Sequence, residues 1–176
     1  INLALDVLIN WFQCRLGKVT YSMESRYGPN SYDCSSAMYY ALNESGFLPL
    51  GTMGNTETLF NHLEAHGWTQ LNDSFYQKGD IFIWGVRGST SGSAGHTGVF
   101  IDSENIIHCN FTANGISINN YESYWETKNK PECTVYRYTA TDMPSFINYE
   151  LKNLSGVFIP NRRLPVCSEP TQISEA

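Results

Sequence analysis

The chain has 176 residues, of which 16% are charged and 41% are hydrophobic, and its formal net charge is −6. A globular chain of this length buries roughly 70% of the surface that its unfolded form exposes, so one domain can fold without a metal or a disulfide. Scattered lysines and arginines on an acidic chain argue against nucleic acid as a partner. The apolar runs are strand-sized and fall far short of the roughly 20 residues of a membrane helix.

Three helices are predicted in the first part of the chain. The first covers residues 3–16, where apolar residues recur at helical intervals. The second runs from Cys34 to Glu44, because Asp33 can cap its first turn. The third begins between residues 55 and 58 and runs through His66, where a glycine follows. These helices are expected to pack on the part of the chain that follows.

Short β-rich runs separated by turn signals make up the second part of the chain. They cover residues 80–84, 97–101, 106–110, 116–119 and 134–138. Helices followed by an antiparallel meander of about five strands form an α+β pattern. The Gly/Ser-rich segment 87–95 lacks the ending of a phosphate loop, so a flexible connection is expected there, with the rim of a cleft as the alternative.

Cys34 is the candidate nucleophile because it begins a predicted helix. The unpaired amides and the dipole of a helix start favour a thiolate, whereas the charge of Asp33 opposes it unless that charge is used in capping. His96, which opens a later strand, is the candidate base for the thiol proton. His108 is the candidate third residue, which would contact the second ring nitrogen of His96 and hold its tautomer and orientation.

This assignment makes a geometric demand on the hairpin that carries the two histidines. Side chains alternate between the faces of a strand, so His96 and His108 share a face only if Gly98 or Phe100 lies opposite His108. A turn that places Val99 there would put the two histidines on opposite faces. The register of this hairpin therefore tests the proposed pair.

Two further histidines suggest a different chemistry. His62 and His66 are spaced i, i+4, which would allow both to bind a metal from one helix face. The residues between them do not follow the His-Glu-x-x-His order, and a zinc-dependent hydrolase is therefore the minor alternative. No metal or other cofactor is expected for the thiol mechanism.

The cysteines give little sign of a disulfide framework. Their number is odd and none has CxxC spacing, which argues against both a disulfide framework and a zinc knuckle. At least one thiol is expected to stay unpaired. A core position is favoured for Cys109 over pairing with Cys133. The five positions are Cys14, Cys34, Cys109, Cys133 and Cys167.

Several sequence motifs together resemble a known family. They are Tyr-Ser-Met at 21–23, Gly-Pro-Asn-Ser-Tyr-Asp-Cys-Ser-Ser at 28–36, Gly-Asp-Ile-Phe-Ile-Trp-Gly at 79–85, Gly-His-Thr-Gly-Val-Phe-Ile-Asp at 95–102 and Asn-Ile-Ile-His-Cys-Asn at 105–110. This set resembles bacteriophage peptidoglycan hydrolases, the catalytic domains of endolysins and a branch of the NlpC-type, papain-like cysteine hydrolases. The resemblance implies a papain-like core with Cys34 as nucleophile, His96 as base and His108 as the orienting residue.

The resemblance also implies roles for three residues around the nucleophile. Tyr21 would bind the oxyanion together with the backbone N–H of Cys34. Asp33 and Ser35 would contact the stem peptide of the substrate. Structural roles are the alternatives, since Tyr21 suits a core position and Asp33 suits a helix cap.

Three segments are expected along the chain. Residues 1–140 would form the hydrolase domain, and residues 141–155 would form a linker because they are rich in Pro, Asn and Ser. Residues 156–176 resemble the opening strands of Src-homology-3-like wall-binding domains. They are too few for an independent barrel, so the full protein is expected to continue with a wall-binding domain.

The predicted function is cysteine-dependent hydrolysis of an amide bond in Gram-positive peptidoglycan. The resemblance favours the bond between N-acetylmuramic acid and L-Ala, with the D-Gln–L-Lys bond of the stem peptide as the alternative. A wall-binding module without catalysis is the rival class, because a chain rich in Tyr and Trp suits sugar stacking. No secretory signal peptide is recognised, which fits an endolysin that waits in the host cytoplasm and then acts at the cell wall without membrane insertion.

Overall fold

The computed structural model describes residues 2–141 and Cys167. Within these residues the helices are α1 (Asn2–Gln13), α2 (Cys34–Glu44), α3 (Thr56–Ala65), the 3-10 turn η1 (Gly92–Ala94) and α4 (Tyr121–Thr127). The strands are β1 (Thr20–Tyr21), β2 (Ser31–Tyr32), β3 (Trp68–Gln70), β4 (Ile81–Trp84), β5 (His96–Phe100), β6 (Asn105–Asn110), β7 (Gly115–Asn120) and β8 (Cys133–Tyr138). The predicted α+β pattern is confirmed.

The main sheet is antiparallel and has six strands in the order β3-β8-β4-β5-β6-β7. The predicted antiparallel sheet is confirmed, with the short strand β3 added to the five strands expected. The predicted meander was wrong, because β8 returns to pair between β3 and β4. Strands β1 and β2 form a separate parallel pair.

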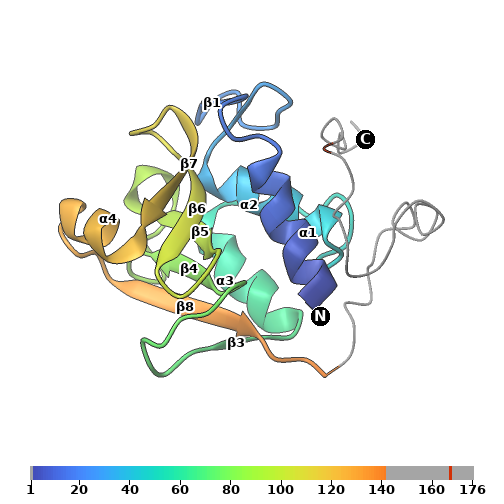
Figure 1. Cartoon of the computed structure of the whole chain (residues 1–176), viewed down its shortest axis with the longest axis vertical. Coiled ribbons are helices and arrows are strands. Elements are labelled where there is room, and N and C mark those ends of the chain that lie inside the picture. Colours follow the sequence, from blue (N-terminus) through green and yellow to red (C-terminus); the bar gives the residue numbers. More distant parts are fainter. Residues whose placement is uncertain (1, 142–166, 168–176) are drawn as a thin grey trace.

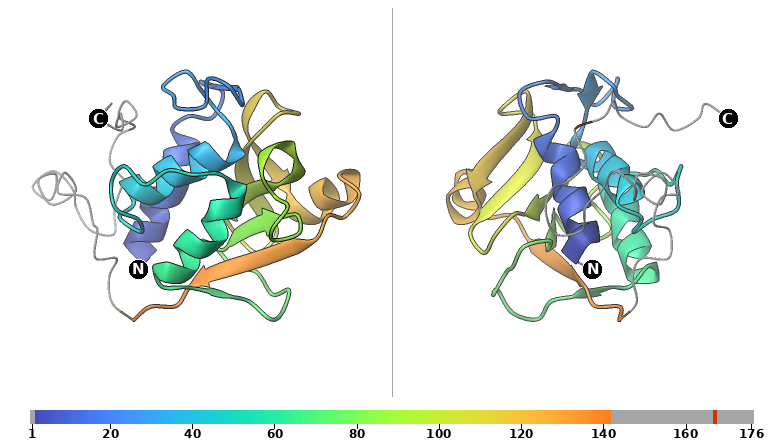
Figure 2. Two further views of the ribbon diagram at one scale, coloured as in Figure 1. Left: turned by 180° about the vertical axis from the view of Figure 1, so that it is seen from behind. Right: turned by 45° about the vertical axis from the view of Figure 1, so that its right-hand side comes forward.

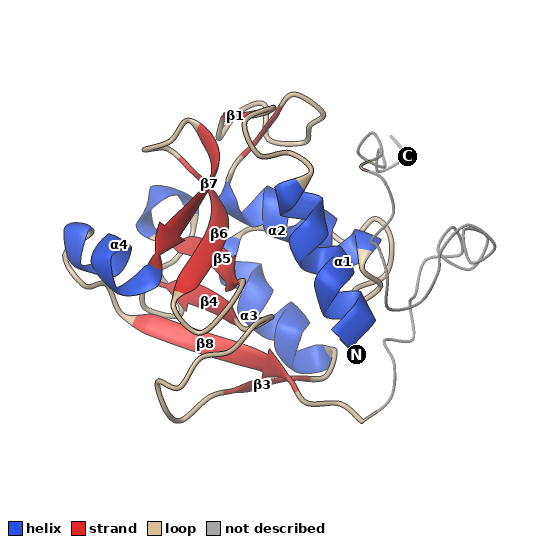
Figure 3. Cartoon of the chain, viewed as in Figure 1, coloured by secondary structure: helices blue, strands red, loops and turns tan. Residues whose placement is uncertain are grey.

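Successive residues of each strand point to opposite faces of the sheet, and each face packs against different helices. Residues such as Ile83 and Val99 face a core shared with α1, α2 and α3, which lie together on one side of the sheet (Figure 1, Figure 3). Phe82 and Phe100 point to the opposite face and pack with Tyr121 of α4. Figure 2 shows the grouped helices and the separate α4 from two further directions. The sheet is thus covered on both faces.

Helix α2 has the bounds that the sequence predicts, and its capping explains why. The side chain of Asp33 accepts the backbone N–H of Ser36 at 2.8 Å, and the hydroxyl of Ser36 accepts the N–H of Asp33 at 3.0 Å. This reciprocal capping box satisfies two amides that the first turn leaves open. Helix α1 ends at Gln13, earlier than predicted, and the turn after it closes at Gly17 with a positive φ of 74°.

Helix α4 is the α-helix that the sequence analysis missed. Its cap is Asn120, whose side chain accepts the N–H of Ser123 at 3.0 Å. Three aromatic residues of this short helix, Tyr121, Tyr124 and Trp125, pack with the second face of the sheet. Seven residues give too little periodicity for a helix to be distinguished from a turn.

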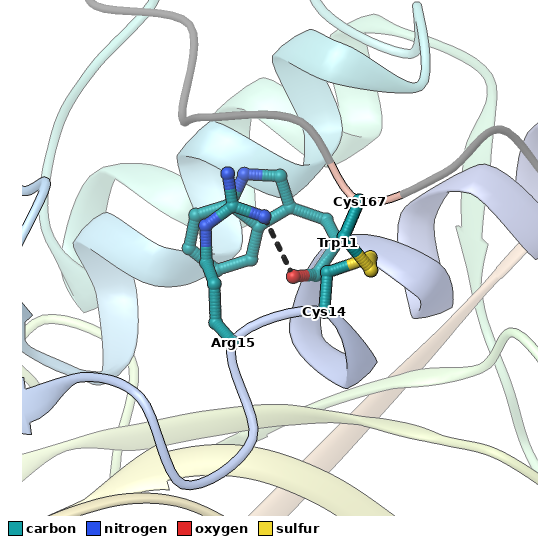
Figure 4. Close-up of a disulfide and its surroundings, with 4 residues drawn as sticks. All are labelled: Trp11, Cys14, Arg15 and Cys167. Atoms are coloured by element: carbon teal, nitrogen blue, oxygen red, sulfur yellow. Dashed lines mark hydrogen bonds between the residues drawn. A yellow bond between two sulfur atoms is a disulfide. The ribbon is translucent and has the colours of Figure 1, made fainter.

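A disulfide joins Cys14, just after α1, to Cys167 (Figure 4). Beside it, the guanidinium of Arg15 stacks on Trp11 and donates to the carbonyl oxygen of that residue. The cysteine pattern argued against a disulfide framework and did not predict this single bond, whereas the expected unpaired thiols are present. Two cysteines lie 153 positions apart, a separation for which no spacing rule exists.

The other described cysteines carry free thiols. Cys109 is fully buried in the core, which confirms the position favoured for it. It is not paired with Cys133, whose sulfur accepts a hydrogen bond from the hydroxyl of Tyr121. Cys34 is the third free thiol.

We expect Cys14→Ser to lower the free energy of unfolding. Closing a loop of 153 residues removes entropy from the unfolded chain, which corresponds to a stabilisation of at most about 5 kcal/mol. Urea unfolding of the oxidised protein measures the loss, with Cys133→Ser, which changes a free thiol, as the control. Equal midpoints for wild type and Cys14→Ser would contradict the prediction.

No helix within residues 2–141 is long and apolar enough to cross a membrane. The predicted linker over 141–155 and the predicted wall-binding segment over 156–176 lie outside the described residues, apart from Thr141 and Cys167. Both stay predictions.

Candidate active site

The sulfur of Cys34 lies where α2, α3 and β5 meet. Cys34 is the first residue of α2 and its side chain is 6% exposed. The sulfur accepts the backbone N–H of Thr97, the residue after His96, and also a hydrogen bond from the hydroxyl of Thr56 at the start of α3. The fold thus brings the predicted nucleophile against the strand that opens with the predicted base.

The two predicted histidines contact each other directly. Nε2 of His96 lies 2.7 Å from Nδ1 of His108. In the hairpin, Val99 pairs with Ile107 and Phe100 with Ile106, so Gly98 lies opposite His108 and the register meets the condition stated above. A Cβ at Gly98 would lie 2.7 Å from the Cβ of His108, so only glycine leaves room for the imidazole.

Aromatic rings pack against this histidine pair. The ring of His96 lies 5.4 Å from that of Trp84, and the ring of His108 lies 4.7 Å from that of Tyr124. Burial therefore lowers the pKa of His96 well below its ordinary value, with further contributions from His108 and Lys128. Burial likewise lowers the pKa of His108 to about 4. Both rings are neutral at neutral pH.

The pKa of the Cys34 thiol is raised to about 11, first by burial and then by the charge of Asp33. The hydrogen bond from Thr97 acts in the opposite direction and is outweighed. The expectation that the helix start favours a resting thiolate was therefore wrong, because desolvation penalises the anion more than the helix start stabilises it. The resting pair is a thiol and a neutral imidazole.

Arg26 is a residue of the site that the sequence analysis missed. Its guanidinium donates to both carboxylate oxygens of Asp33, at 2.6 and 3.1 Å. It also donates to the hydroxyl of Ser35 at 2.9 Å and to the carbonyl oxygen of Gly54 at 2.8 Å. Asp33 and Ser35, predicted to contact substrate, thus both have partners inside the protein. Nothing in a scattered arginine signals such a contact, since it depends on the loop between β1 and β2.

Tyr21, the predicted oxyanion ligand, lies near the nucleophile in strand β1. Its phenol is half-buried, and its pKa is raised by burial and then by the neighbouring Cys34 thiol. On its other side, its ring meets that of Phe111 edge-on at 6.0 Å, and Phe111 is 80% exposed. Tyr21 is therefore near both the thiol and an exposed aromatic side chain.

His62 and His66 use ring nitrogens in contacts within the protein. Nδ1 of His62 lies 2.6 Å from the hydroxyl of Tyr39, and Nδ1 of His66 lies 2.8 Å from the carbonyl oxygen of His62. Among residues 2–141 and Cys167, no group of three or more side chains is arranged to hold a metal ion. The geometry of the described residues thus gives the zinc alternative no support.

The Gly/Ser-rich segment 87–95 is anchored to α3, which differs from the flexible connection that was expected. The carboxylate of Glu57 accepts the backbone N–H of Gly88 at 2.9 Å and that of Thr90 at 3.1 Å. Arg87 binds Glu64 and Asn61 of the same helix. The segment therefore leads to His96 by a fixed path.

Comparisons with known proteins show which family the chain belongs to. Residues 4–144 match the family described as bacteriophage peptidoglycan hydrolase. The chain belongs to this family. A lysin of Pneumococcus phage Dp-1 is 46% identical to this phage hydrolase over 134 residues, which are 74% of the present chain and 45% of the lysin. The chain thus covers about half the length of that relative.

Solved structures show which fold the hydrolase has. The NlpC/p60 domain of the peptidoglycan hydrolase SagA is 16% identical with a TM-score of 0.53, covering 74% of the present chain and 97% of that domain. The P60 domain of antigen MAP1204 from M. avium subspecies paratuberculosis is 14% identical with a TM-score of 0.54, covering 78% and 96%. The predicted NlpC-type, papain-like fold is confirmed.

Lys128, just after α4, adds to the effect of burial on the two histidines. Its positive charge lowers the pKa of both His96 and His108. With His96 as the proposed base, protonation would prevent it from accepting the thiol proton, so we expect activity to fall as the pH drops through its folded pKa. Because that pKa is lowered, we expect kcat/KM to hold at pH 6 and to fall only in more acidic solution.

Lys128→Gln removes this charge, which raises both histidine pKa values and moves the acid limb to higher pH. The pH profile of kcat/KM measures the shift. Lys130→Gln is the matched control, because Lys130 lies over the ring of Trp125 and is not among the groups that perturb the two histidines. Identical acid limbs for wild type and Lys128→Gln would contradict the prediction.

Proposed function

We propose that this phage hydrolase cleaves an amide bond of Gram-positive peptidoglycan by a cysteine mechanism, as an N-acetylmuramoyl-L-alanine amidase. The observation that carries the proposal is the arrangement of Cys34, His96 and His108. A free thiol at a helix start lies against the strand of His96, and the remaining ring nitrogen of His96 faces away from its 2.7 Å contact with His108. This is the order of nucleophile, base and orienting group.

In the proposed mechanism, His96 takes the proton of the Cys34 thiol as the sulfur attacks the carbonyl carbon. The hydroxyl of Tyr21 and the backbone N–H of Cys34 bind the oxyanion that forms. The imidazolium of His96 then gives its proton to the leaving amine as the C–N bond breaks, which leaves a thioester. Water, deprotonated by His96, hydrolyses the thioester and restores the thiol.

The pairing of Asp33 bears on the acyl side of the substrate. Arg26 engages both oxygens of Asp33, so the carboxylate beside the nucleophile has its charge compensated. A free amino group on the acyl side of the substrate would need an unpaired carboxylate there. Neither the lactyl group of N-acetylmuramic acid nor an L-Ala–D-Gln segment attached to the glycan carries such an amine, so the pairing fits an uncut stem peptide, and the choice of the amidase bond rests on the resemblance. In this proposal, Asp33 and Ser35 shape the substrate site through Arg26.

The hydrolase would wait in the host cytoplasm and act at the cell wall, with peptidoglycan as its partner. Mass spectrometry of fragments released from purified Gram-positive peptidoglycan tests the proposal. Intact stem peptides that begin with L-Ala would support the amidase. A new L-Lys amine, with L-Ala–D-Gln left on the glycan, would show the endopeptidase instead. Binding without release of any fragment would overturn catalysis in favour of a wall-binding module.

A further inference from the structure

A chain of hydrogen bonds continues behind the two catalytic histidines. Nε2 of His108 lies 2.8 Å from Oδ1 of Asn119 on the neighbouring strand β7. The same oxygen accepts the hydroxyl of Ser117 at 2.7 Å. That hydroxyl in turn accepts the side-chain amide of Asn110 at 2.8 Å. The chain therefore runs through the β6–β7 hairpin from a buried asparagine to the histidine pair.

A backbone amide fixes the direction of this chain. The N–H of Ala113 donates to the side chain of Asn110 at 2.8 Å, and a backbone amide can only donate. The atom of Asn110 that faces Ala113 is therefore the oxygen, and its NH₂ group faces Ser117. Since the Ser117 hydroxyl accepts this NH₂ group, its own hydrogen is free to donate, and it donates to Oδ1 of Asn119, the oxygen that also faces Nε2 of His108.

The same donor-to-acceptor order determines which nitrogen of each imidazole holds the proton. Because Oδ1 of Asn119 accepts, Nε2 of His108 must hold a proton, and in a neutral ring its Nδ1 then accepts. The Nε2 of His96 must hold a proton to donate to that nitrogen. This leaves the Nδ1 lone pair of His96 free for the thiol proton of Cys34. The amide of Asn110 also lies 3.4 Å from Nε2 of His108, a longer contact than the 2.8 Å to Asn119.

We propose that Asn119, held by Ser117 and Asn110, is a positioning residue that fixes the tautomers of His108 and His96 and so keeps the base ready. The proposal rests on the proposed cysteine mechanism. It goes beyond the nucleophile, base and third residue, since Asn119 touches neither the thiol nor a substrate bond. The residues that carry it are buried or half-buried: His108 is fully buried and Asn110 is 3% exposed.

Nuclear magnetic resonance of the hydrolase with ¹⁵N-labelled histidine tests the tautomers without any activity. We expect both His96 and His108 to carry the proton on Nε2 at neutral pH. Asn119→Leu, which keeps the size and removes the acceptor, should give His108 a mixture of tautomers. A wild-type His108 that carries its proton on Nδ1 would overturn the proposal.

Kinetics of the same variants test the consequence. Asn119→Leu should lower kcat by about 10- to 100-fold, as loss of an outer orienting group does, with KM changed by less than about two-fold. Ile118→Ala is the matched control, because its side chain points to the other face of β7 and is 44% exposed. Wild-type kcat in Asn119→Leu would overturn the proposal.

Asn119→Asp separates positioning from packing. The carboxylate keeps the acceptor, so kcat at neutral pH should recover relative to Asn119→Leu. Its charge also favours a protonated His108, so the acid limb should move to higher pH. The other titratable groups facing the pair are Lys128 and Tyr124 at α4. A loss of activity equal to that of Asn119→Leu, with no shift in the acid limb of the pH profile, would indicate that Asn119 acts only through packing and would overturn the proposal.

Activity that survives Cys34→Ala would overturn the proposed function. The tautomers of His96 and His108 would still be decided by nuclear magnetic resonance.

Discussion

Cys34→Ala should abolish the release of peptidoglycan fragments, with a loss in kcat of at least about 10⁴-fold. The thiol is the only atom at this junction of α2, α3 and β5 that can form the covalent intermediate of the proposed mechanism. Fragment release from purified peptidoglycan, followed by reducing-end and amine analysis, measures the loss. The variant removes one small buried side chain, so circular dichroism should show the wild-type fold.

Two further variants test whether the loss comes from the thiol of Cys34. Cys133→Ser changes another free thiol and should keep wild-type activity, because Cys133 lies at the start of β8, where it contacts Tyr121 of α4. The double variant Cys34→Ala, His96→Ala should lose no more than Cys34→Ala alone, since the two residues act as one unit. Activity that survives Cys34→Ala but is lost on adding a chelator would point to the zinc chemistry considered for His62 and His66.

Arg26→Met should produce the largest loss of stability among single changes around the site. It leaves the carboxylate of Asp33, a side chain that is 10% exposed, without its charged partner. Removing one member of a largely buried ion pair costs about 3 kcal/mol of unfolding free energy. Since Asp33 already raises the pKa of the Cys34 thiol, its uncompensated charge should raise that pKa further and lower activity. Urea unfolding and kcat measure the two effects.

The chain offers a matched control for this arginine. Arg87 binds Glu64 with side chains that are 45% and 40% exposed, so Arg87→Met should cost less than about 1 kcal/mol. The double variant Arg26→Met, Asp33→Asn removes the charge and keeps a capping side chain, and should recover much of the stability. Equal losses from Arg26→Met and Arg87→Met would contradict our interpretation of the buried pair.

The local features of this fold were readable from the sequence, and the nonlocal ones were not. Helix α2 was predicted with its correct bounds because a capping residue and a following glycine mark both ends. The insertion of β8 between β3 and β4 was missed, since the sequence of a strand does not show which strands it pairs with. The disulfide between Cys14 and Cys167 is nonlocal in the same sense.

The candidate site also contains residues that could be predicted from the sequence and residues that could not. Cys34, His96 and His108 stand out because their residue types suggest chemistry, and the register that unites the two histidines was stated as a condition on Gly98. Asn119 gave no signal, because a polar residue on an alternating strand is also typical of a solvent-facing position. The pKa direction of the thiol was mistaken, since burial cannot be read from a helix start.

The neutral resting state of Cys34 also bears on chemical durability. Peroxides and alkylating reagents attack the thiolate, and the protonated thiol reacts slowly. With a pKa raised to about 11 and a side chain 6% exposed, very little of this sulfur is nucleophilic in the free hydrolase at neutral pH. In the proposed mechanism the nucleophile forms only when His96 accepts the proton beside a bound carbonyl, so we expect the sulfur to be spared in an oxidising medium until substrate arrives.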